Sequence, residues 1–128
     1  MKYENITHKI IGCAYKVYNT LGFGYLESVY KNALVIELAN HNLKAESEKP
    51  LIVYYQSHPV GQFFVDLLVE DEVVVELKAV QHLAKEHEVQ LVNYLNGLQR
   101  EIGLLINFGS GKVEIKRKYR SPLHPNEL

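Results

Sequence analysis

Residues 62–80 read QFFVDLLVEDEVVVELKAV, and this stretch decides the fold that the sequence predicts. Two apolar runs rich in Val, Leu and Phe lie on either side of the polar tripeptide at positions 70–72. Two such runs separated by a short polar loop are typical of a β-hairpin. We therefore expect two antiparallel strands here, with Val69 opposite Val73.

Charged residues interrupt this apolar hairpin. In the expected register Asp66 lies directly opposite Glu76, with the two Cβ atoms roughly 4.5–5.5 Å apart. Lys78 shares a face with Glu76, because side chains alternate along a strand. Facing carboxylates in a half-buried site need a counter-charge, a shared proton or a divalent cation. A hard cation such as Mg²⁺ binds carboxylate and backbone oxygens and keeps several waters. The pattern therefore suits metal-assisted hydrolysis of a phosphate ester, with Lys78 beside the attacking water.

The context of this charged cluster matters, because an acidic residue two positions before a Lys is common by chance. The chain has a second such tripeptide, Glu114-x-Lys116, but that one lies beside a basic run with no Asp opposite. Glu76 instead lies in an apolar strand, facing one of only two aspartates in the chain. A simple salt bridge of Lys78 with Asp66 or Glu76 at the end of the sheet is the alternative interpretation, and the residues alone leave both open.

Three other segments have apolar residues at helical spacing. They cover residues 10–21, about 26–39 and about 87–99. Asn5 or Thr7 is the expected N-cap of the first helix, and a glycine follows it as a stop signal. The side chains expected to face the core from the second helix are Leu26, Val29, Tyr30, Ala33 and Leu34.

Further strands are expected on both sides of the central hairpin. Residues 51–55 (LIVYY) predict a strand, and residues 57–61 (SHPVG) predict a turn. Residues 102–109 (IGLLINFG) predict a buried strand, and residues 113–119 (VEIKRKY) an edge strand. The order of two helices, three strands, one helix and two strands indicates an α/β (mixed α+β) fold, with a central mixed sheet flanked by helices.

The length and composition are those of a single globular domain over residues 1–128. A frayed tail is expected at residues 121–128. A net charge of −1 excludes a strongly basic nucleic-acid coat. Cys13 is the only cysteine, so we expect neither an internal disulfide nor a multi-cysteine zinc site, and a cytoplasmic location. No apolar run approaches the length of a membrane span.

Three more motifs accompany the hairpin: GYLESVY at 24–30, QLVNYL at 90–95 and GLLINFG at 103–109. In this order, the motifs resemble those of the GxxExxY protein family, a branch of the PD-(D/E)XK nuclease-like superfamily. The resemblance covers about residues 6–117. It implies a restriction-endonuclease-like fold, in which a mixed sheet of about four strands has helices on both sides.

The resemblance also implies a metal site that uses Mg²⁺ or Mn²⁺. Asp66 would be the first ligand, Glu76 the second and the backbone carbonyl of Leu77 a third. Lys78 would position or activate the water, or stabilise charge on the phosphate. Val65 stands where the superfamily's name has a Pro.

Outside the hairpin, the resemblance assigns two further site residues. Glu27 matches the Glu of the family's naming motif and would bring an extra acid near the metal. Gln90 matches the Gln of a Q-x-x-x-Y stretch, completed by Tyr94, and would line the site. The implied activity is metal-dependent hydrolysis of phosphodiester bonds in nucleic acid, DNA or RNA.

Two matters stay open at the level of sequence. The only basic cluster contains Lys116, Arg117 and Lys118, which either contact a phosphate backbone or form a solvated edge strand. The alternative to an enzyme is a non-catalytic nuclease-like module that binds nucleic acid or a protein partner. A homodimer is a further possibility, because symmetric targets often require two copies.

Overall fold

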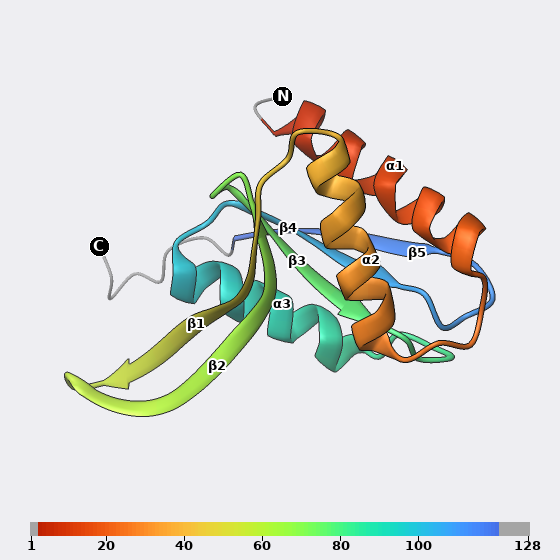
Figure 1. The fold of residues 1–128 in the computed structure, drawn as a ribbon. Helices are drawn as coiled ribbons and strands as arrows, with labels where there is room; N and C mark the ends of the chain where they lie inside the picture. Colours follow the sequence, from red (N-terminus) through yellow and green to blue (C-terminus); the bar gives the residue numbers. More distant parts are fainter. Residues whose placement is uncertain (1–2, 121–128) are drawn as a thin grey trace.

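The computed structural model describes residues 3–120, which form a mixed α/β fold (Figure 1). Its elements are α1 (Glu4–Leu21), α2 (Glu27–Asn40), β1 (Ala45–Tyr55), β2 (His58–Val69), β3 (Val73–Lys78), α3 (Lys85–Leu98), β4 (Ile102–Asn107) and β5 (Glu114–Tyr119). This order is the one that the hydrophobic patterns predict. The expected frayed tail at 121–128 lies outside the described residues.

The strands form one sheet of five, in the order β1-β2-β3-β4-β5. Neighbouring strands are antiparallel except β3 and β4, which run parallel. A parallel pair needs a crossover connection, and α3 supplies it. The sheet is therefore mixed, as expected, and it has one strand more than the resemblance implies.

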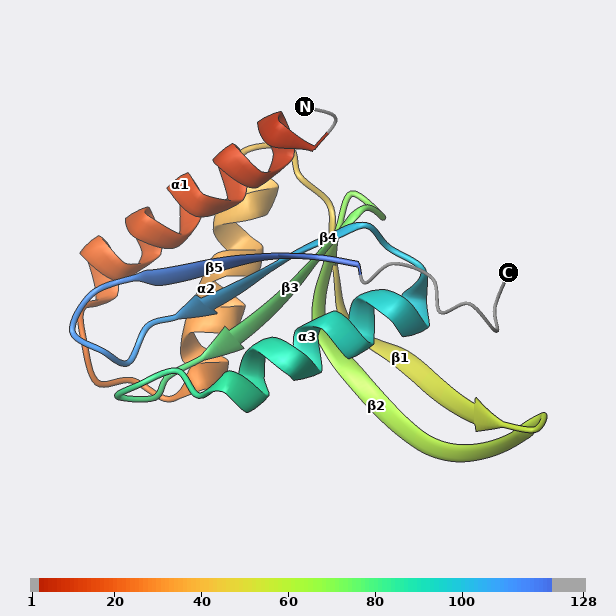
Figure 2. The ribbon, with the colours of Figure 1, turned by 180° about the vertical axis from the view of Figure 1, so that it is seen from behind.

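Helices cover both faces of the sheet (Figures 1 and 2). On one face, α1 and α2 pack in a large hydrophobic cluster with alternate residues of β3 and β4, including Val75, Leu77 and Leu104. On the other face, α3 packs Leu91 and Leu95 in a smaller cluster. The helix between β3 and β4 thus lies opposite the two N-terminal helices.

The central hairpin has the predicted register. Val69 pairs with Val73 and Leu68 with Val74, so residues 70–72 form the loop. Asp71 in this loop forms an ion pair of 2.9 Å with Arg100. The alternation of apolar residues was sufficient to predict this register, because a shift of one residue would move buried side chains to the opposite face.

Two expectations for the helix ends are wrong. The N-cap of α1 is Tyr3, not Asn5 or Thr7, because the helix begins one turn before its first buried residue. Thr7 lies within the helix, where its hydroxyl donates to the carbonyl of Glu4 at 3.1 Å. Leu26 is 75% exposed rather than inward-facing, because it precedes α2 as the N-cap residue.

The expected turn at residues 57–61 is also wrong, because β2 begins at His58. Tyr55 pairs with His58, so the turn consists of Gln56 and Ser57, with φ angles of 50° and 67°. Positive φ at both positions is the geometry of a type I′ turn, which usually contains Gly or Asn. Gln56 and Ser57 are therefore not residues from which this turn could be predicted. The strands are therefore longer than predicted.

The extra length forms a projecting hairpin, which we call the arm (residues 50–64). Pairing of β2 with β3 ends at Leu67, whereas pairing of β2 with β1 continues to His58. The arm consequently extends away from the body of the molecule (Figures 1 and 2). No helix among residues 3–120 has the length and apolar character of a membrane span.

Candidate active site

Two carboxylates meet where β2 and β3 separate. Backbone pairing between these strands ends at Leu67 and Val75, and the next residues are Asp66 and Glu76. The backbone N–H of Asp66 donates to Glu76 Oε2 at 2.6 Å, and that of Leu77 donates to Asp66 Oδ2 at 2.8 Å. Each carboxylate thus replaces a backbone acceptor of the opposite strand. The structure brings the two acids together, as the register predicts.

The charges of this pair are poorly compensated. Glu76 is only 5% exposed, and burial together with the nearby Asp66 raises its pKa to about 8. Burial also raises the pKa of Asp66, although the bond from Leu77 N–H and the charge of Lys31 oppose this shift. Without a cation, the buried Glu76 carboxyl therefore favours its neutral form near pH 7.

Lys78 lies at the end of β3, near these acids. Its charge lowers the pKa of Glu76 and of Asp66, although burial has the larger effect on both groups. Within residues 3–120 Lys78 forms no ion pair, so the salt bridge considered as an alternative is not formed in this structure.

A buried asparagine holds the backbone around Lys78. Asn107 of β4 pairs with Lys78, and its Oδ1 accepts from the N–H groups of Val80 at 3.0 Å and Gly109 at 3.1 Å. Its Nδ2 donates to the carbonyl of Val80 at 2.8 Å and to Glu114 at 2.9 Å. The hydrogen bonds of this buried amide are satisfied, and they fix the segment after Lys78. Sequence reasoning missed this residue, although a polar side chain ending an apolar strand was a signal.

Helix α2 brings Glu27 toward the site from the other layer. Glu27 as a whole is exposed, but packing around its carboxyl and the charge of Asp66 raise its pKa. One turn later the hydroxyl of Tyr30 donates to the carbonyl of Gly22 at 2.5 Å, and its ring stacks on Phe108 with centroids 4.6 Å apart. Tyr30 therefore fixes the start of α2, and with it the position of Glu27.

Lys31 is a site residue that the sequence did not reveal. It follows Glu27 by four residues, so both side chains lie on the same side of α2. The side chain of Lys31 is largely buried and forms an ion pair with Glu48. Its charge lowers the pKa of Asp66, with a larger effect than that of Lys78. The i, i+4 spacing from Glu27 is the signal that could have found it.

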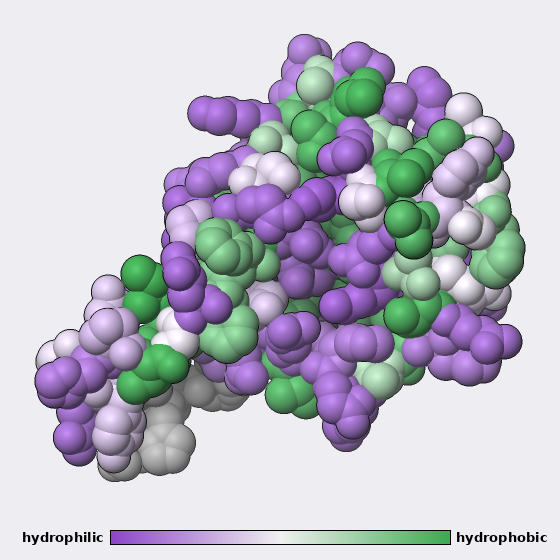
Figure 3. All heavy atoms as spheres, turned by 60° about the horizontal axis from the view of Figure 1, so that its bottom comes forward, coloured by the Kyte–Doolittle hydropathy of each residue, from purple (hydrophilic) through white to green (hydrophobic). Residues whose placement is uncertain are grey.

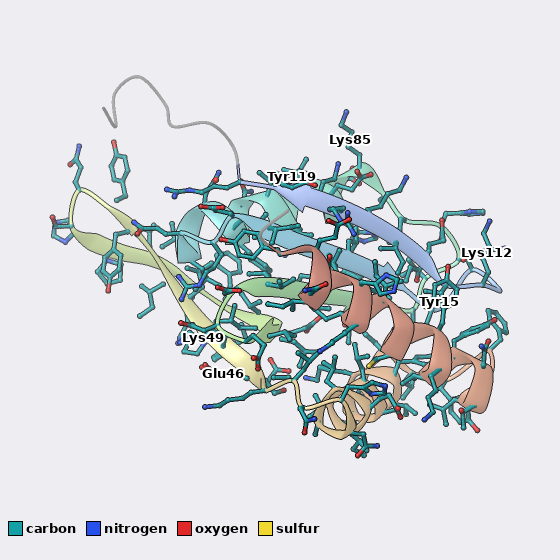
Figure 4. The ribbon with its side chains drawn as sticks, turned by 90° about the horizontal axis from the view of Figure 1, so that it is seen from above. Tyr15, Glu46, Lys49, Lys85, Lys112 and Tyr119 are labelled. Carbon is teal, nitrogen blue, oxygen red and sulfur yellow. The ribbon has the colours of Figure 1, made fainter. Side chains whose placement is uncertain are left out.

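Its partner Glu48 lies on the other side of Asp66. In β1, Ser47 pairs with Leu67 and Lys49 with Val65, which leaves Glu48 opposite Asp66. The φ angle of Glu48 is 55°, a conformation that few residues other than glycine adopt. Glu46 and Lys49 lie side by side on β1 (Figure 4) and form their own ion pair at 3.2 Å. No local sequence pattern predicts this irregularity.

On the opposite face of the sheet, α3 contributes the two residues of the Q-x-x-x-Y stretch. Gln90 Nε2 donates to the hydroxyl of Tyr94 at 2.9 Å. Burial and the charges of Glu76 and Asp66 raise the pKa of Tyr94, which places its hydroxyl within their electrostatic reach. Gln90 is thus the hydrogen-bond partner of a buried tyrosine on α3, as the shared Q-x-x-x-Y stretch places them one turn apart.

The basic run is divided between the two faces of β5. Lys118 forms an ion pair of 2.6 Å with Glu88 of α3. Arg117 points to the other face, where its Nη2 lies 3.5 Å from the hydroxyl of Thr7. Lys116 pairs with Leu105 of the neighbouring strand β4. The three residues do not form one patch, and their contact with nucleic acid stays a prediction.

Two carboxylates, those of Asp66 and Glu76, are the oxygen donors that the hairpin brings together. Among residues 3–120, no group of three or more His, Cys, Asp and Glu side chains is placed to hold a metal ion. Asp66 and Glu76 each use one oxygen in the hydrogen bonds described, which leaves the other oxygen of each for a cation. Mg²⁺ is commonly held by one or two carboxylates together with waters and substrate phosphates. The residues therefore fit a hard divalent cation.

Comparisons with known proteins give the fold and the family. The structure of the protein SSO0001 matches with a TM-score of 0.61 and 18% sequence identity, covering 79% of this chain and 53% of that one. This chain thus spans about half of that protein, and the likeness shows the fold alone. No protein of curated function matches. Residues 4–118 match the PD-(D/E)XK nuclease superfamily, so the chain belongs to that superfamily.

Proposed function

We propose that this chain is a metal-dependent nuclease that hydrolyses phosphodiester bonds in nucleic acid. Membership of a nuclease superfamily supports a nuclease-like function. The observation that carries the proposal is the pair of carboxylates on β2 and β3, half-buried Asp66 and buried Glu76, with the pKa of Glu76 raised to about 8. Burying one acid beside a second, half-buried one destabilises the fold, and a bound cation offsets that effect.

In this proposal, Asp66 and Glu76 hold Mg²⁺ or Mn²⁺, with the backbone carbonyl of Leu77 as a further ligand. Such a cation, when bound, stabilises charge on the phosphate and lowers the pKa of bound water. The ammonium group of Lys78 orients the attacking water and offsets negative charge as the phosphate is attacked. Asn107 keeps Lys78 in place through the backbone after it.

We further infer that the chain belongs to the GxxExxY branch. Gly24, Glu27 and Tyr30 carry the naming motif. Gly24 has a φ of 107°, which favours glycine. The hydroxyl of Tyr30 donates a hydrogen bond that fixes the start of α2. The charge of Asp66 contributes to the raised pKa of Glu27. Glu27 acts in this proposal as an additional acid at the site.

A cleavage assay with a matched lysine control tests the nuclease function. Lys78→Met removes the ammonium group at the site. Lys44→Met removes an exposed one at the opposite end of the β2–β3 hairpin, next to Glu70. Labelled DNA and RNA, single-stranded and duplex, are incubated with each protein and Mg²⁺ or Mn²⁺. We expect cleavage of at least one substrate by the wild type and Lys44→Met, and a loss of at least about 100-fold in Lys78→Met.

Two results would contradict the proposal. Equal cleavage by Lys78→Met and Lys44→Met would show that the activity does not use this site. Binding of Mn²⁺ at the carboxylates without cleavage of any substrate would favour the non-catalytic nucleic-acid-binding module instead.

A further inference from the structure

A groove runs between the arm and α3. Leu51 and Phe63 of the arm form one wall, and Gln90, Asn93 and Tyr94 of α3 form the other. Figure 3 shows the arm standing apart from the body, with hydrophobic residues exposed among polar ones. The groove is open to the surface, and its walls include Leu51 and Tyr94, which belong to the smaller hydrophobic cluster.

A glycine determines how closely the arm approaches α3. A Cβ atom on Gly97 would lie 2.8 Å from a methyl carbon of Leu51, closer than side chains tolerate. Gln90, Tyr94 and Gly97 recur at helical spacing, so they share the face of α3 that looks at the arm. The contact at Gly97 closes one end of the groove, and Gln90 and Tyr94 lie further along it.

The chemistry of this groove is aromatic and amide. The rings of Phe63 and Tyr94 have centroids 5.9 Å apart and are inclined at 48° to each other. Phe63 is 41% exposed and Tyr54, at the outer wall, 61% exposed. No Lys, Arg, Asp or Glu is among the described residues that line the groove. Aromatic faces stack on nucleobases, whereas amide side chains bond to base edges.

The groove lies beside the proposed active site. Phe63 precedes Asp66 by three residues on β2, and Val65, next to Asp66, packs in the same hydrophobic cluster as Tyr94. Tyr94 also accepts a hydrogen bond of 2.9 Å from Gln90. A nucleotide next to a phosphate held at the carboxylates would therefore find its base beside these side chains. A duplex presents phosphates on its outside and would need cationic groups, which this groove lacks.

We propose that the groove between the arm and α3 binds unpaired bases of a single-stranded nucleic acid. This rests on the proposed function, because the strand that occupies the groove is the one whose phosphate reaches Asp66 and Glu76. Phe63, the exposed ring, stacks on a base, with the buried ring of Tyr94 packed against it, and Asn93 bonds to base edges. The substrate class is consequently single-stranded nucleic acid, or a single-stranded end of a duplex.

Neighbouring phenylalanines of β2 allow a matched test. Phe63 pairs with Leu51 on the side facing α3, whereas Phe64, 53% exposed, points to the other face. Binding of fluorescein-labelled oligothymidylate, oligouridylate and a DNA duplex, each about 12 nucleotides long, is measured by anisotropy in EDTA, where no metal-dependent cleavage occurs. We expect Phe63→Ala to weaken single-strand binding roughly 5- to 100-fold and Phe64→Ala to change it less than about 2-fold.

A second variant keeps the test informative if Phe63→Ala folds poorly. Asn93→Asp preserves the size of an exposed side chain but adds a negative charge to the groove, which repels a polyanion. We expect at least about a 5-fold loss of single-strand affinity, with an unchanged circular dichroism spectrum. Comparing the DNA and RNA oligonucleotides shows which sugar the strand carries.

Three outcomes would overturn the proposal. They are equal affinities of Phe63→Ala and Phe64→Ala, binding of duplex at least as tight as of single strands, and a wild-type dimer that Phe63→Ala dissociates. The last would mean that a second copy of the chain covers the groove. Binding that depends on Phe63 without cleavage of any substrate would uphold the groove and reject the nuclease function, so the two failures are distinguishable.

Discussion

At the scale of single residues, the placement of Glu76 beside Asp66 lowers the stability of the folded protein by an amount that can be measured. Glu76 is almost completely buried, and only Asp66 N–H donates a hydrogen bond to its carboxylate among the contacts described. Its pKa of about 8 lies well above the ordinary value of 4.5. A carboxyl with a raised pKa in the folded state lowers stability once the unfolded chain ionises.

This shift predicts the pH dependence of stability. Between about pH 4.5 and pH 8, the unfolded chain has lost the proton of Glu76 and the folded chain retains it. Unfolding therefore releases a proton, and the free energy of unfolding falls as pH rises, by up to about 1.4 kcal/mol per pH unit. Urea unfolding of metal-free protein at about pH 5.5 and about pH 7.5 should show this decrease, and Glu76→Gln should remove most of it.

An exposed acid provides the control for this measurement. Glu86→Gln alters a solvent-exposed carboxyl in the first turn of α3 and should keep the wild-type slope. If the free energy of unfolding of the wild type stays constant or rises over this pH range, the pKa of Glu76 is not raised in the folded protein.

The residues of the site differ in how far sequence could predict them. Asp66 and Glu76 were predictable because the apolar alternation of the hairpin sets which residues face each other. Lys31 had a signal in its i, i+4 spacing from Glu27. Glu48 had none, because it lies where β1 departs from regular strand geometry, with a φ of 55°. Asn107 had a signal as a polar residue at the end of an apolar strand, but its partners could not be predicted without the loop that it anchors.

At the scale of elements, the connection from β4 to β5 is packed against the segment that follows β3. A Cβ atom built on Gly109 would lie 2.3 Å from the backbone N of Val80 and 2.4 Å from the carbonyl carbon of Ala79. Both contacts are with backbone, which cannot move aside as a flexible side chain can. The absence of a side chain at Gly109 is thus a requirement for placing the backbone after Lys78.

Two glycine-to-alanine changes should consequently have opposite effects. Gly109→Ala should destabilise the protein by at least about 1–3 kcal/mol, as overpacking does. Gly12→Ala, in the interior of α1 with nothing within 4 Å of its Cβ position, should stabilise it by up to about 1 kcal/mol. Urea unfolding of both variants measures the difference, and a Gly109→Ala protein as stable as the wild type would contradict the packing described.

Helices and strands could be predicted from the sequence where one pattern of apolar residues was clear. Periodicity predicted the three helices within a few residues at most ends, and the buried strand β4 followed from its continuous apolar run. The arm did not follow, because its turn at Gln56 and Ser57 has positive φ angles without the usual Gly or Asn. From the sequence alone, the long hairpin of the arm could not be distinguished from a shorter strand followed by a loop.

At the scale of the whole molecule, the order of elements was enough to predict a mixed sheet with helices on both faces. Parallel pairing of β3 and β4 follows from the helix between them. The direction of the arm and its distance from α3 could not be predicted, because they depend on packing between Leu51 and Gly97. These are contacts between residues far apart in the sequence.

A ligand that binds only the folded state raises the stability of the entire domain. We therefore expect Mn²⁺ at about 100 times its dissociation constant to stabilise the wild type by about 2.7 kcal/mol, which raises Tm by several degrees. Glu76→Gln should show no such increase, while Glu86→Gln should respond like the wild type. Differential scanning calorimetry in EDTA and in Mn²⁺ measures the shift, and an equal rise in Glu76→Gln would place the metal elsewhere.

An open sheet also has two outer strands, whose free backbone groups are templates for pairing with a second chain. β5 is one of them, and alternating Lys116, Arg117 and Lys118 place positive charge on both of its faces. β1 is the other, where Pro50 lacks an N–H donor and Glu48 departs from extended geometry. Positive charge on β5 and irregular backbone on β1 thus disfavour pairing of these edge strands with another chain. This effect does not depend on whether the basic residues bind nucleic acid.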